Sequence, residues 1–587
     1  MTTHPPTGES GGALPSWVPD EATLTRLASE FFGTLPGPEP EDELSDDSAK
    51  HVVESSGEAI GSRPQSKPAY PFAGDIAGDI PGYMPFDVAS AYHRATSSPP
   101  RLAGPSAQSS ATAVQGLPPS AAAALSGVTR SGELERAQSG PSVSGIGAPS
   151  FYFIEERVWA PSRPVVCDSR AGMPVEAYPA FHVEAVRRDF PVLQERIHGR
   201  QLVWLDNGAT TQKPQAVIDR LAYFYSHENS NIHRSAHALA ARSSDAYEGA
   251  RATVAEFLGA PSASSVVFTR GTTEAINLVA QSWGRKHLSA DDEIVISHLE
   301  HHANIVPWQQ LAAEKGAKLK VIPVDDDGRV LLDAYEELLS ERTKIVAIAQ
   351  VSNVLGTIVP VKEIIAAAHR AGAKVLVDGA QAVAHMVVDV QELDADFYVF
   401  SGHKIFAPTG IGALYGKPEL LEEMPPWQGG GNMIADVTFE RTLYQRPPAK
   451  FEAGTGNIAG AVGLGAALDY LSRLGRPIVE RYEHDLLQYA IGEIRSVPGL
   501  RLIGTAPEKA SVLTFVLEGY TPDEVGSALD QEAIAVRAGH HCAQPILRRY
   551  GLESAVRPSL AMYNTYAEVD LLVAALRRLA GDGGNRH

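Results

Sequence analysis

The sequence predicts a large α/β region with a mostly parallel sheet, preceded by a long leader of different composition. Residues 1–180 hold 23 of the chain's 41 prolines, and proline, glycine and serine together make up 65 of these 180 residues. From about Phe181 onward, short runs rich in Val and Ile alternate with amphipathic stretches. Strands that alternate with helices form a mostly parallel sheet covered by helices on both faces.

The leader, residues 1–180, is expected to be largely disordered. A segment rich in chain breakers and poor in aliphatic runs buries too little apolar surface to offset the entropy of ordering it. An acidic run at residues 39–47 is interpreted as a solvated spacer. Apolar stretches at 24–32, 73–86 and 151–159 stand out from the polar background. Such stretches are either docking motifs that fold on binding or residual local structure.

Composition and charge argue against several classes of protein. The chain of 587 residues has 50 Lys and Arg against 70 Asp and Glu, a formal net charge of −20, so we expect no nucleic-acid partner. No apolar run approaches the ~18 residues of a membrane span, and residues 1–12 lack the basic and apolar parts of a secretory signal. The cysteines are Cys167 and Cys542 alone, which predicts no disulfide framework, no cysteine-rich zinc site and a reducing, cytoplasmic location.

Apolar runs after Phe181 predict the strands of the sheet. They lie at 266–269, 293–297, 318–324, 344–351, 374–379 and 396–402. The stretch 361–372 has apolar residues at three- and four-residue spacing and closes on a glycine, which predicts a helix. Ligands of parallel sheets bind at the carboxyl ends of the strands. The functional residues should therefore directly follow these runs.

Three of these runs are followed by groups that suit one cofactor. The turn of Gly271, Thr272 and Thr273 opens a helix and offers N–H groups, hydroxyls and a dipole to a phosphate, although threonine also caps helices for structural reasons alone. Asp378 ends another run, and Lys404 follows the next, before an apolar, glycine-rich stretch that would lower the pKa of its amine. Pyridoxal 5'-phosphate needs an anion site, a carboxylate for its ring nitrogen and a lysine for its aldehyde.

Longer motifs, in order along the chain, carry a family resemblance. They are LDNGATTQKP (205–214), NIHR (231–234), RGTTEAINLVA (270–280), LEHHANIVPWQ (299–309), VSNVLGT (351–357), VDGAQAV (377–383), SGHKIFAPTGIG (401–412), RAGHHCAQP (537–545) and RPSLAMYNT (557–565). With these motifs the chain from 181 to 587 resembles a group II cysteine desulfurase, which supplies sulfur for iron–sulfur cluster assembly.

The resemblance implies the pyridoxal-phosphate fold of type I. A large domain at 181–465 would hold a mostly parallel seven-stranded sheet and the cofactor. A smaller α+β domain at 466–587 would carry the nucleophilic cysteine, and residues 181–200 would pack on this small domain.

The resemblance also implies roles at the matching positions. Lys404 would hold the cofactor's aldehyde as a Schiff base and then shuttle the Cα proton of the substrate. The other expected contacts are Asp378 with the ring nitrogen, His301 stacked on the ring as a further catalytic residue, Gln381 with the phenolic oxygen, Thr272, Thr273, Ser401 and His403 with the phosphate, and Asn353, Arg537 and Arg557 with the substrate.

One cofactor contact is expected to come from a second copy of the chain. Thr455, in the loop 453–457, would reach the phosphate of the partner subunit in a homodimer. The family usually has proline where this chain has Gly456, so this chain departs from the pattern at that loop.

Cys542 indicates which reaction the cofactor serves, because most enzymes of this fold need no nucleophilic thiol. Neighbouring cations lower the pKa of a thiol from about 8.5. The thiolate would attack the sulfur of L-cysteine, release L-alanine and keep a persulfide for a sulfur-acceptor protein. A selenocysteine lyase or cysteine sulfinate desulfinase is the alternative. His302 is expected to be structural, His541 either positions the loop or donates a proton, and Cys167 is interpreted as incidental.

The leader is a departure from the family, whose catalytic unit ordinarily starts near Phe181. Long Pro/Gly/Ser-rich leaders on desulfurases of this group resemble those of cargo enzymes packaged in encapsulin shells. Several weak apolar stretches could engage repeated sites on a shell, because multivalency raises avidity without any strong single contact. Docking to a sulfur acceptor and plain solubilisation are the alternatives for this segment.

Overall fold

The computed structural model describes residues 181–233 and 236–583. The predictions for the leader, including its apolar stretches and Cys167, lie outside the described residues.

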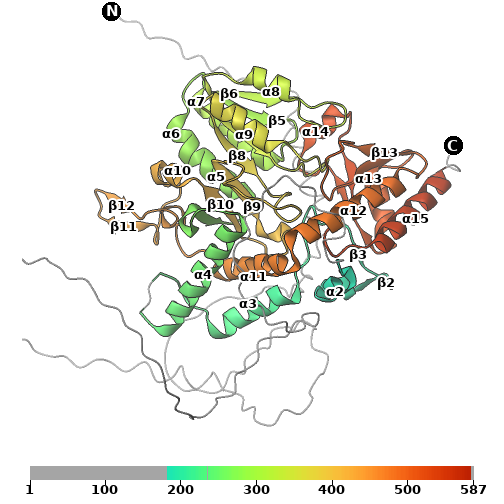
Figure 1. Ribbon diagram of the computed structural model, residues 1–587, viewed down its shortest axis with the longest axis horizontal. Helices are drawn as coiled ribbons and strands as arrows, with labels where there is room; N and C mark the ends of the chain where they lie inside the picture. The colour runs from blue at the N-terminus through green and yellow to red at the C-terminus, as the bar shows by residue number, and fades with distance from the viewer. Residues whose placement is uncertain (1–180, 234–235, 584–587) are drawn as a thin grey trace, which may run out of the picture. The chain divides into compact units, whose positions relative to one another are not determined.

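A seven-stranded sheet forms the centre of the described chain (Figure 1). Its strand order is β4 (Val266–Thr269), β10 (Gly412–Gly416), β9 (Phe397–Ser401), β8 (Lys374–Asp378), β7 (Thr343–Ala349), β5 (Glu293–Ser297) and β6 (Lys318–Ile322). Only β10 runs antiparallel to its neighbours in this sheet. The predicted fold class, with a mostly parallel seven-stranded sheet, is confirmed.

Both faces of this sheet are buried, because successive side chains of each strand enter two different cores. In β7, Val346 and Ile348 pack in one core, whereas Ile345 and Ala347 pack in the other. The first core is covered by α3 (Gln215–His227), α4 (Ala238–Phe257), α8 (Leu332–Leu338), α9 (Val361–Arg370) and α11 (Ile458–Leu474). The second is covered by α5 (Thr272–Val279), α7 (Val306–Lys315) and α10 (Pro418–Glu423). Strands buried on both faces read as continuous apolar runs, which is why the sequence revealed them.

One strand of the sheet was missing from the sequence prediction. β10 has glycine at both ends, and its short apolar segment lies in the stretch that we interpreted only as apolar and glycine-rich. Gly412 is required there, because a Cβ atom would come within 2.6 Å of the Gly271 backbone. The close approach brings β10 beside the turn that opens α5.

A second, antiparallel sheet belongs to the C-terminal part of the chain, drawn in orange to red in Figure 1. Its order is β13 (Leu500–Ile503), β14 (Thr514–Leu517), β17 (Ala555–Arg557) and β16 (Arg537–Gly539). The helices α12 (Arg476–Ile494), α13 (Pro522–Asp530) and α15 (Tyr566–Gly583) share its core. Strand β17 places Arg557, and β16 places Arg537 directly opposite it.

Residues 181–200 contact this C-terminal part. The rings of Phe181 and Tyr482 lie 4.7 Å apart, and Arg187 in α2 (Val183–Arg188) pairs with Glu568 at 2.9 Å. The predicted domain boundary at residue 465 falls inside α11, which has residues of the first core on both sides of this position, among them Leu464 and Leu468. The exact division into two domains stays a prediction.

The remaining short elements connect these layers. They are β1 (Arg196–Ile197), β2 (Arg200–Gln201), β3 (Val203–Trp204), α6 (Arg285–His287), β11 (Ile434–Val437), β12 (Thr442–Tyr444), β15 (Ile534–Ala535), α14 (Gln544–Arg549) and the 3-10 turns at Pro191–Gln194, Ala263–Ser265, His302–Asn304, Gly402–Lys404 and Ala449–Phe451, with a π-helical turn at Ala280–Gly284.

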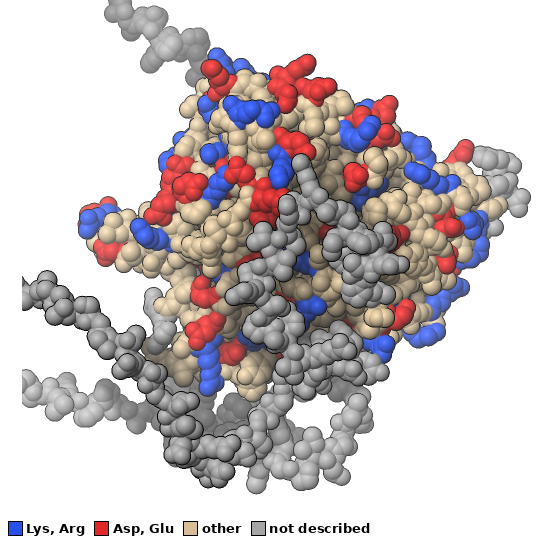
Figure 2. Space-filling view, viewed as in Figure 1, with Lys and Arg blue, Asp and Glu red and all other residues tan. Residues whose placement is uncertain are grey.

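The surface of the described residues mixes both signs of charge. Figure 2 shows Lys and Arg side chains interspersed with Asp and Glu on the visible face, without a continuous basic patch. None of the helices in the described ranges is long and apolar enough to cross a membrane. The same ranges contain no cluster of three or more His, Cys, Asp or Glu side chains that could hold a metal ion.

Candidate active site

A cavity of about 350 Å³ lies at the carboxyl ends of β7, β8 and β9, where the sequence placed the functional residues. It is lined by the predicted residues Thr272, Thr273, His301, Asn353, Asp378, Gln381, Ser401, His403, Lys404, Arg537, Cys542 and Arg557. Segments that are far apart in the sequence, from both sheets, thus meet at one site. Thr455 is the one predicted site residue that does not line this cavity.

Asp378 is the last residue of β8 and is buried at the floor of the site. Burial raises the pKa of its carboxyl, while the N–H of Ala380, which donates to Oδ1 at 2.9 Å, and the charge of Lys404 lower it. A carboxylate that is buried at this cost is stabilised by a positive group beside it. The protonated ring nitrogen of pyridoxal phosphate is such a group.

Lys404 stands at the end of the 3-10 turn that follows β9. Burial lowers the pKa of its amine to about 8, and the charge of Arg557 adds to the effect, whereas Asp378 and Cys542 oppose it. An amine with this pKa is neutral far more often near pH 7 than an ordinary lysine, and only the neutral form attacks a carbonyl. The lowered pKa suits an amine that attacks a carbonyl, and the role of Lys404 in holding the cofactor stays a prediction.

An anion cradle lies at the N-terminus of α5. The N–H of Thr272 donates to the Ser401 hydroxyl at 2.9 Å, and the two hydroxyls lie 2.8 Å apart. Gly271 has a φ of 151°, and a Cβ atom there would lie 3.1 Å from the Ser401 hydroxyl. Burial, with the charges of Lys404 and Lys213, lowers the pKa of His403 to about 4, so this ring is a neutral hydrogen-bonding group. The helix dipole and these donors together suit a phosphate.

The ring of His301 is fixed and neutral. Its Nδ1 accepts the N–H of Ala303 at 3.0 Å, which leaves the ring proton on Nε2. Burial lowers the pKa of His301 to about 3, and the neighbouring cation Lys404 acts in the same direction. A neutral ring is suited to stacking on an aromatic cofactor.

Glu300, which the sequence analysis did not single out, anchors the segment that carries His301. Its carboxyl accepts from the Ser297 hydroxyl at 2.5 Å, from the Asn304 side chain at 2.7 Å and from the N–H of Ala349 at 3.1 Å. Burial raises the pKa of this carboxyl to about 7. These hydrogen bonds connect the segment that carries His301 to the end of β7.

Two arginines form the part of the cavity expected to bind the substrate carboxylate. Arg557 is buried, and burial lowers the pKa of its guanidinium to about 10. It donates through Nη1 to the Asn353 carbonyl at 2.9 Å, and its Nε, like the Asn353 Oδ1, has no hydrogen-bond partner among the described residues. A buried donor without a partner costs free energy unless a ligand accepts from it. An anionic substrate group fits this position.

Asp206 is a second residue that the sequence analysis did not single out. It accepts from Arg537 Nε at 3.1 Å and Nη2 at 2.7 Å, and it lies 3.5 Å from Arg557 Nη2. Asp206 therefore positions the guanidinium groups of both arginines, one on β16 and one on β17. The sequence signal that could have pointed to Asp206 is its position at the start of the motif LDNGATTQKP.

Cys542 is exposed and lies in a tightly constrained loop. His541 and Cys542 both have left-handed backbone conformations, with φ of 51° and 53°. The His540 ring accepts the Cys542 N–H at 3.0 Å, and the Cys542 carbonyl accepts the His302 N–H at 2.8 Å. The thiol and the amine of Lys404 line the same cavity, as the predicted chemistry requires.

The histidines beside Cys542 have distinct contacts. His302 accepts the Gln544 N–H on Nε2 at 3.2 Å, and the His302 and His540 rings stack 5.8 Å apart. His541 is buried, and its Nε2 donates to the Ala555 carbonyl at 2.9 Å. Burial lowers the pKa of His541 to about 3. These contacts are those of residues that hold the cysteine loop.

Gln381 also faces the cavity, and its side-chain amide donates to the Gly208 carbonyl at 2.7 Å. This hydrogen bond joins the turn after β8 to the motif LDNGATTQKP. Gln381 and the buried Asp378 line the same cavity, and the contact of Gln381 with the phenolic oxygen of the cofactor stays a prediction.

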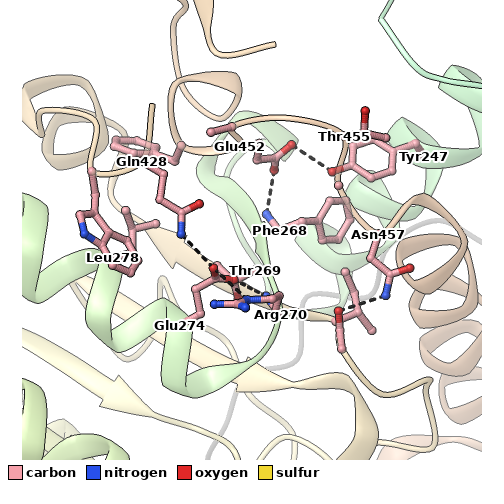
Figure 3. A pocket seen from close by; sticks show the side chains of 16 residues that line it. Tyr247, Phe268, Thr269, Arg270, Glu274, Leu278, Gln428, Glu452, Thr455 and Asn457 are labelled. Carbon is pink, nitrogen blue, oxygen red and sulfur yellow. Dashed lines mark hydrogen bonds and ion pairs between the residues drawn. The ribbon is translucent and has the colours of Figure 1, made fainter. Parts of the chain in front are cut away.

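Thr455 lines a different cavity, of about 490 Å³, together with Thr269, Arg270 and Glu274 (Figure 3). The expectation that Thr455 reaches the phosphate of a partner subunit stays a prediction.

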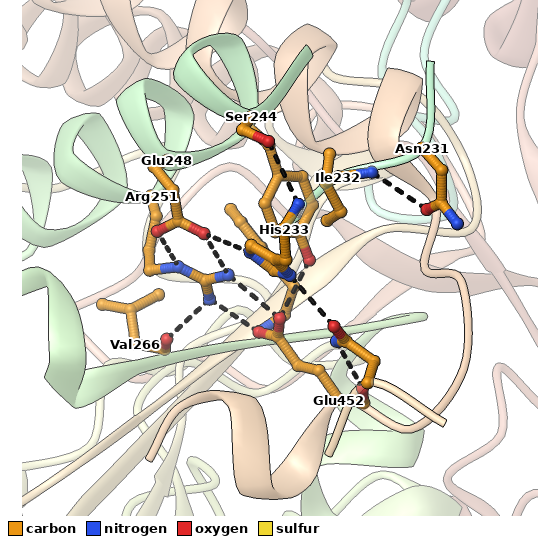
Figure 4. A network of polar contacts seen from close by, with 11 residues as sticks. Asn231, Ile232, His233, Ser244, Glu248, Arg251, Val266 and Glu452 are labelled. Atoms are coloured by element: carbon orange, nitrogen blue, oxygen red, sulfur yellow. Dashed lines mark hydrogen bonds and ion pairs between the residues drawn. The ribbon is translucent and has the colours of Figure 1, made fainter. Parts of the chain in front are cut away.

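A buried network positions the loop of Thr455 (Figure 4). The Glu452 carboxylate accepts from Arg251 at 2.6 and 2.9 Å, from the Tyr247 hydroxyl at 3.0 Å and from the Phe268 N–H at 2.8 Å. Because β4 is an edge strand, the Phe268 N–H has no strand neighbour, and Glu452 satisfies it. One carboxylate thus fixes the edge strand and the start of the loop 453–457.

The residues at the cavity fit pyridoxal phosphate. A cradle of N–H and hydroxyl groups suits its phosphate, the buried Asp378 suits its ring nitrogen, and the amine of Lys404 suits its aldehyde.

Comparison with known proteins supports the same interpretation. Residues 203–572 match the model of the class-V aminotransferase family. A cysteine desulfurase of Synechococcus elongatus is 63% identical over 455 residues, which cover 75% of this chain and 72% of that protein. A cysteine desulfurase of Dickeya dadantii is 54% identical over 407 residues, covering 69% of this chain and 98% of that protein.

A solved structure agrees with these relatives. The crystal structure of the cysteine desulfurase CsdA (S-sulfonic acid) from Escherichia coli has a TM-score of 0.64 at 42% identity and covers 69% of this chain and 99% of that chain. The matched regions contain both sheets and the cavity between them. The chain therefore belongs to the cysteine desulfurases of the class-V aminotransferase family, enzymes whose cofactor is pyridoxal phosphate.

Proposed function

We propose that the chain converts L-cysteine to L-alanine and keeps the sulfur as a persulfide on Cys542. The observation that carries this proposal is the shared cavity of Cys542, Lys404, Asp378 and Arg557. Transamination would need the lysine, the acid and the arginine, but it would give no role to an exposed thiol in a loop held by two histidines.

The residues divide the chemistry among themselves. Arg557 and Arg537 bind the substrate carboxylate, and Asp206 keeps both guanidinium groups in place. Bound pyridoxal phosphate supplies an electron sink for the pair left at Cα. The neutral amine of Lys404 takes the Cα proton, which is the usual task of a base with a pKa near the working pH.

Sulfur transfer follows at the thiol. The Sγ of Cys542 attacks the substrate sulfur, and a sulfur–sulfur bond forms as the bond between Cβ and sulfur breaks. The electron pair stays with Cβ, which takes up a proton, and Cα regains the proton that Lys404 held. The products are alanine and a persulfide on Cys542, so no oxidant or reductant is consumed.

The substrate can be tested by measuring alanine release with L-cysteine, L-selenocysteine and L-cysteine sulfinate at equal concentrations. We expect L-cysteine to give a persulfide on Cys542 in step with alanine. The alternative enzymes, a selenocysteine lyase or a cysteine sulfinate desulfinase, would release alanine faster from their own substrates and without a Cys542 persulfide. Faster turnover of either compound would replace the proposed substrate.

The loop of Cys542 favours a group II enzyme with a separate sulfur-acceptor protein. The loop from Arg537 to Pro545 is short, and His302 and His540 hold it in place. A constrained loop carries the persulfide only a short distance, so an acceptor must come to the cavity mouth. We propose that the sulfur is then used for iron–sulfur cluster assembly or is stored.

A homodimer would complete the cofactor site. We propose that Thr455 of one subunit contributes to the phosphate site of its partner. The fixed position of its loop, through Glu452 and Arg251, supports a contact role for this otherwise exposed segment.

We further propose that the leader targets the enzyme to an encapsulin shell in the cytoplasm. The composition of residues 1–180 and their apolar stretches support this role.

Deleting residues 1–180 tests the role of the leader. We expect the shortened enzyme to keep its alanine release within about twofold, because the cavity is built from residues after 205, and to lose co-purification with a co-expressed shell protein. A scrambled leader of the same composition is the matched control. Packaging of the shortened enzyme at the full-length level would end the cargo proposal.

A further inference from the structure

The carbonyl oxygen of His403, directly before Lys404, receives donors from a single segment, Thr210–Lys213. It accepts the Thr211 N–H at 2.9 Å, the Thr210 hydroxyl at 3.0 Å and the Thr211 hydroxyl at 3.2 Å, and the Lys213 ammonium lies 3.4 Å away. A carbonyl oxygen has two lone pairs, so these four donors are more than one backbone oxygen ordinarily accepts. The oxygen is therefore held from several directions.

The position of Lys213 is energetically unfavourable for a charged side chain. Burial lowers the pKa of its ammonium to about 8, and no carboxylate of the described chain contributes to that pKa. Its contacts are the His403 and Thr211 carbonyls and, at 3.5 Å, the Thr210 hydroxyl. A half-buried cation without an acidic partner is unfavourable. Its location is best explained by the carbonyls that it draws together.

The same segment also holds the chain after Lys404. The Thr211 hydroxyl oxygen accepts the Phe406 N–H at 2.7 Å. Phe406 has a φ of 62°, a left-handed conformation that non-glycine residues rarely adopt, and its ring is fully buried. The backbone is thus held one residue before Lys404 and two residues after it. These hydrogen bonds restrict the backbone on both sides of the lysine.

The segment itself is anchored to the C-terminal part of the chain. The Gln212 N–H donates to the Tyr563 hydroxyl at 3.0 Å, and this hydroxyl donates in turn to the Asn207 side chain. Tyr563 is fully buried. The segment that supplies the donors around the His403 carbonyl is therefore itself held by hydrogen bonds to a buried side chain.

We propose that Lys213 is a positioning residue for Lys404: its ammonium keeps the Thr210–Lys213 segment on the His403 carbonyl and so aims the amine of Lys404 at the reacting carbon. This inference rests on the proposed role of Lys404. Displacement of a reacting group by about 1 Å can cost about a hundredfold in rate, so a modest loosening of this turn should be measurable.

The test is Lys213→Met, which removes the ammonium and keeps the length of the side chain. We expect the rate at which the apo-protein takes up pyridoxal phosphate, followed by visible absorbance, to fall about tenfold. The kcat for alanine release should fall by a similar factor, while KM for L-cysteine stays within about twofold, because the arginine site is untouched. Lys213→Arg should restore most of both rates, because it restores a cationic donor.

Lys450→Met is the matched control. The Lys450 ammonium also sits on backbone carbonyls, of Glu422 at 2.8 Å and Met424 at 3.2 Å, and burial also lowers its pKa, but it does not line the active-site cavity. This variant should keep both rates. If Lys213→Met behaves like Lys450→Met, the proposal is overturned.

A second variant covers the case in which Lys213→Met does not fold. Thr210→Val removes one hydroxyl from the same carbonyl, and it should lower both rates by a smaller factor at unchanged KM. Unchanged rates in this variant would overturn the proposal. Failure of the proposed function is separate, because it would appear as wild-type apo-protein that takes up pyridoxal phosphate without covalent attachment at Lys404.

Discussion

Cys542→Ala should bind pyridoxal phosphate with normal absorbance and yet form neither alanine nor persulfide from L-cysteine. The residues expected to contact the cofactor lie on other segments, so the colour should remain, whereas no other cysteine is present in the described residues to attack the substrate sulfur. Loss of an essential nucleophile typically costs several orders of magnitude in turnover, on the order of 10⁴ or more. Alanine yield and mass analysis of a trapped persulfide measure both products.

The chain offers its own control for this substitution. Cys167→Ala removes the other thiol, which lies outside the described residues, and should leave both products unchanged. Alanine tolerates the left-handed backbone at position 542 no better and no worse than cysteine, so the loop should keep its fold. Normal alanine release by Cys542→Ala would contradict direct attack by this thiol.

The positions of the strands could be predicted from the sequence because burial on both faces leaves a continuous apolar run. The rule that ligands bind at the carboxyl ends of such strands then located Asp378 and the turn of Lys404, both of which line the cavity. The sequence analysis did not identify β10, since it has glycine at both ends, with Gly412 packed closely against the Gly271 backbone and Gly416 against the Leu421 side chain, and only a short apolar segment lies between them.

Residues that act through contacts could not be found in the same way. Asp206 and Arg537 are 331 positions apart, and nothing in either local pattern indicates that they pair. Lys213 lies 190 positions from the carbonyl that it contacts, and a lysine in a polar stretch ordinarily predicts exposed surface. Thr455 lines another cavity of the described chain, and its proposed contact with the cofactor of a partner subunit involves a second chain, so the contacts within one subunit do not determine it.

Lys404→Ala should lose the covalent attachment of the cofactor and nearly all turnover. The variant removes the amine that we propose both holds the aldehyde and serves as the base for the Cα proton, and loss of a general base alone costs about 10²–10⁴-fold. Absorbance after gel filtration and mass analysis of the reduced protein measure the attachment. Added methylamine should restore part of the turnover by supplying a free amine. Lys450→Ala, which leaves the cavity intact, is the control.

The pH dependence of cofactor uptake distinguishes the buried amine from an ordinary lysine. Because burial lowers the pKa of Lys404 to about 8, the neutral, nucleophilic form makes up about half of the amine at pH 8 and is nearly complete about one pH unit above it. Uptake of pyridoxal phosphate by wild-type apo-protein should therefore rise with pH, reach half of its maximum near pH 8 and level off about one pH unit higher. An unperturbed lysine, with a pKa of about 10.4, would give a rate that keeps rising to about pH 10. A rise of that kind would show that the amine is not desolvated, and it would remove the physical basis for assigning Lys404 as both attachment point and base.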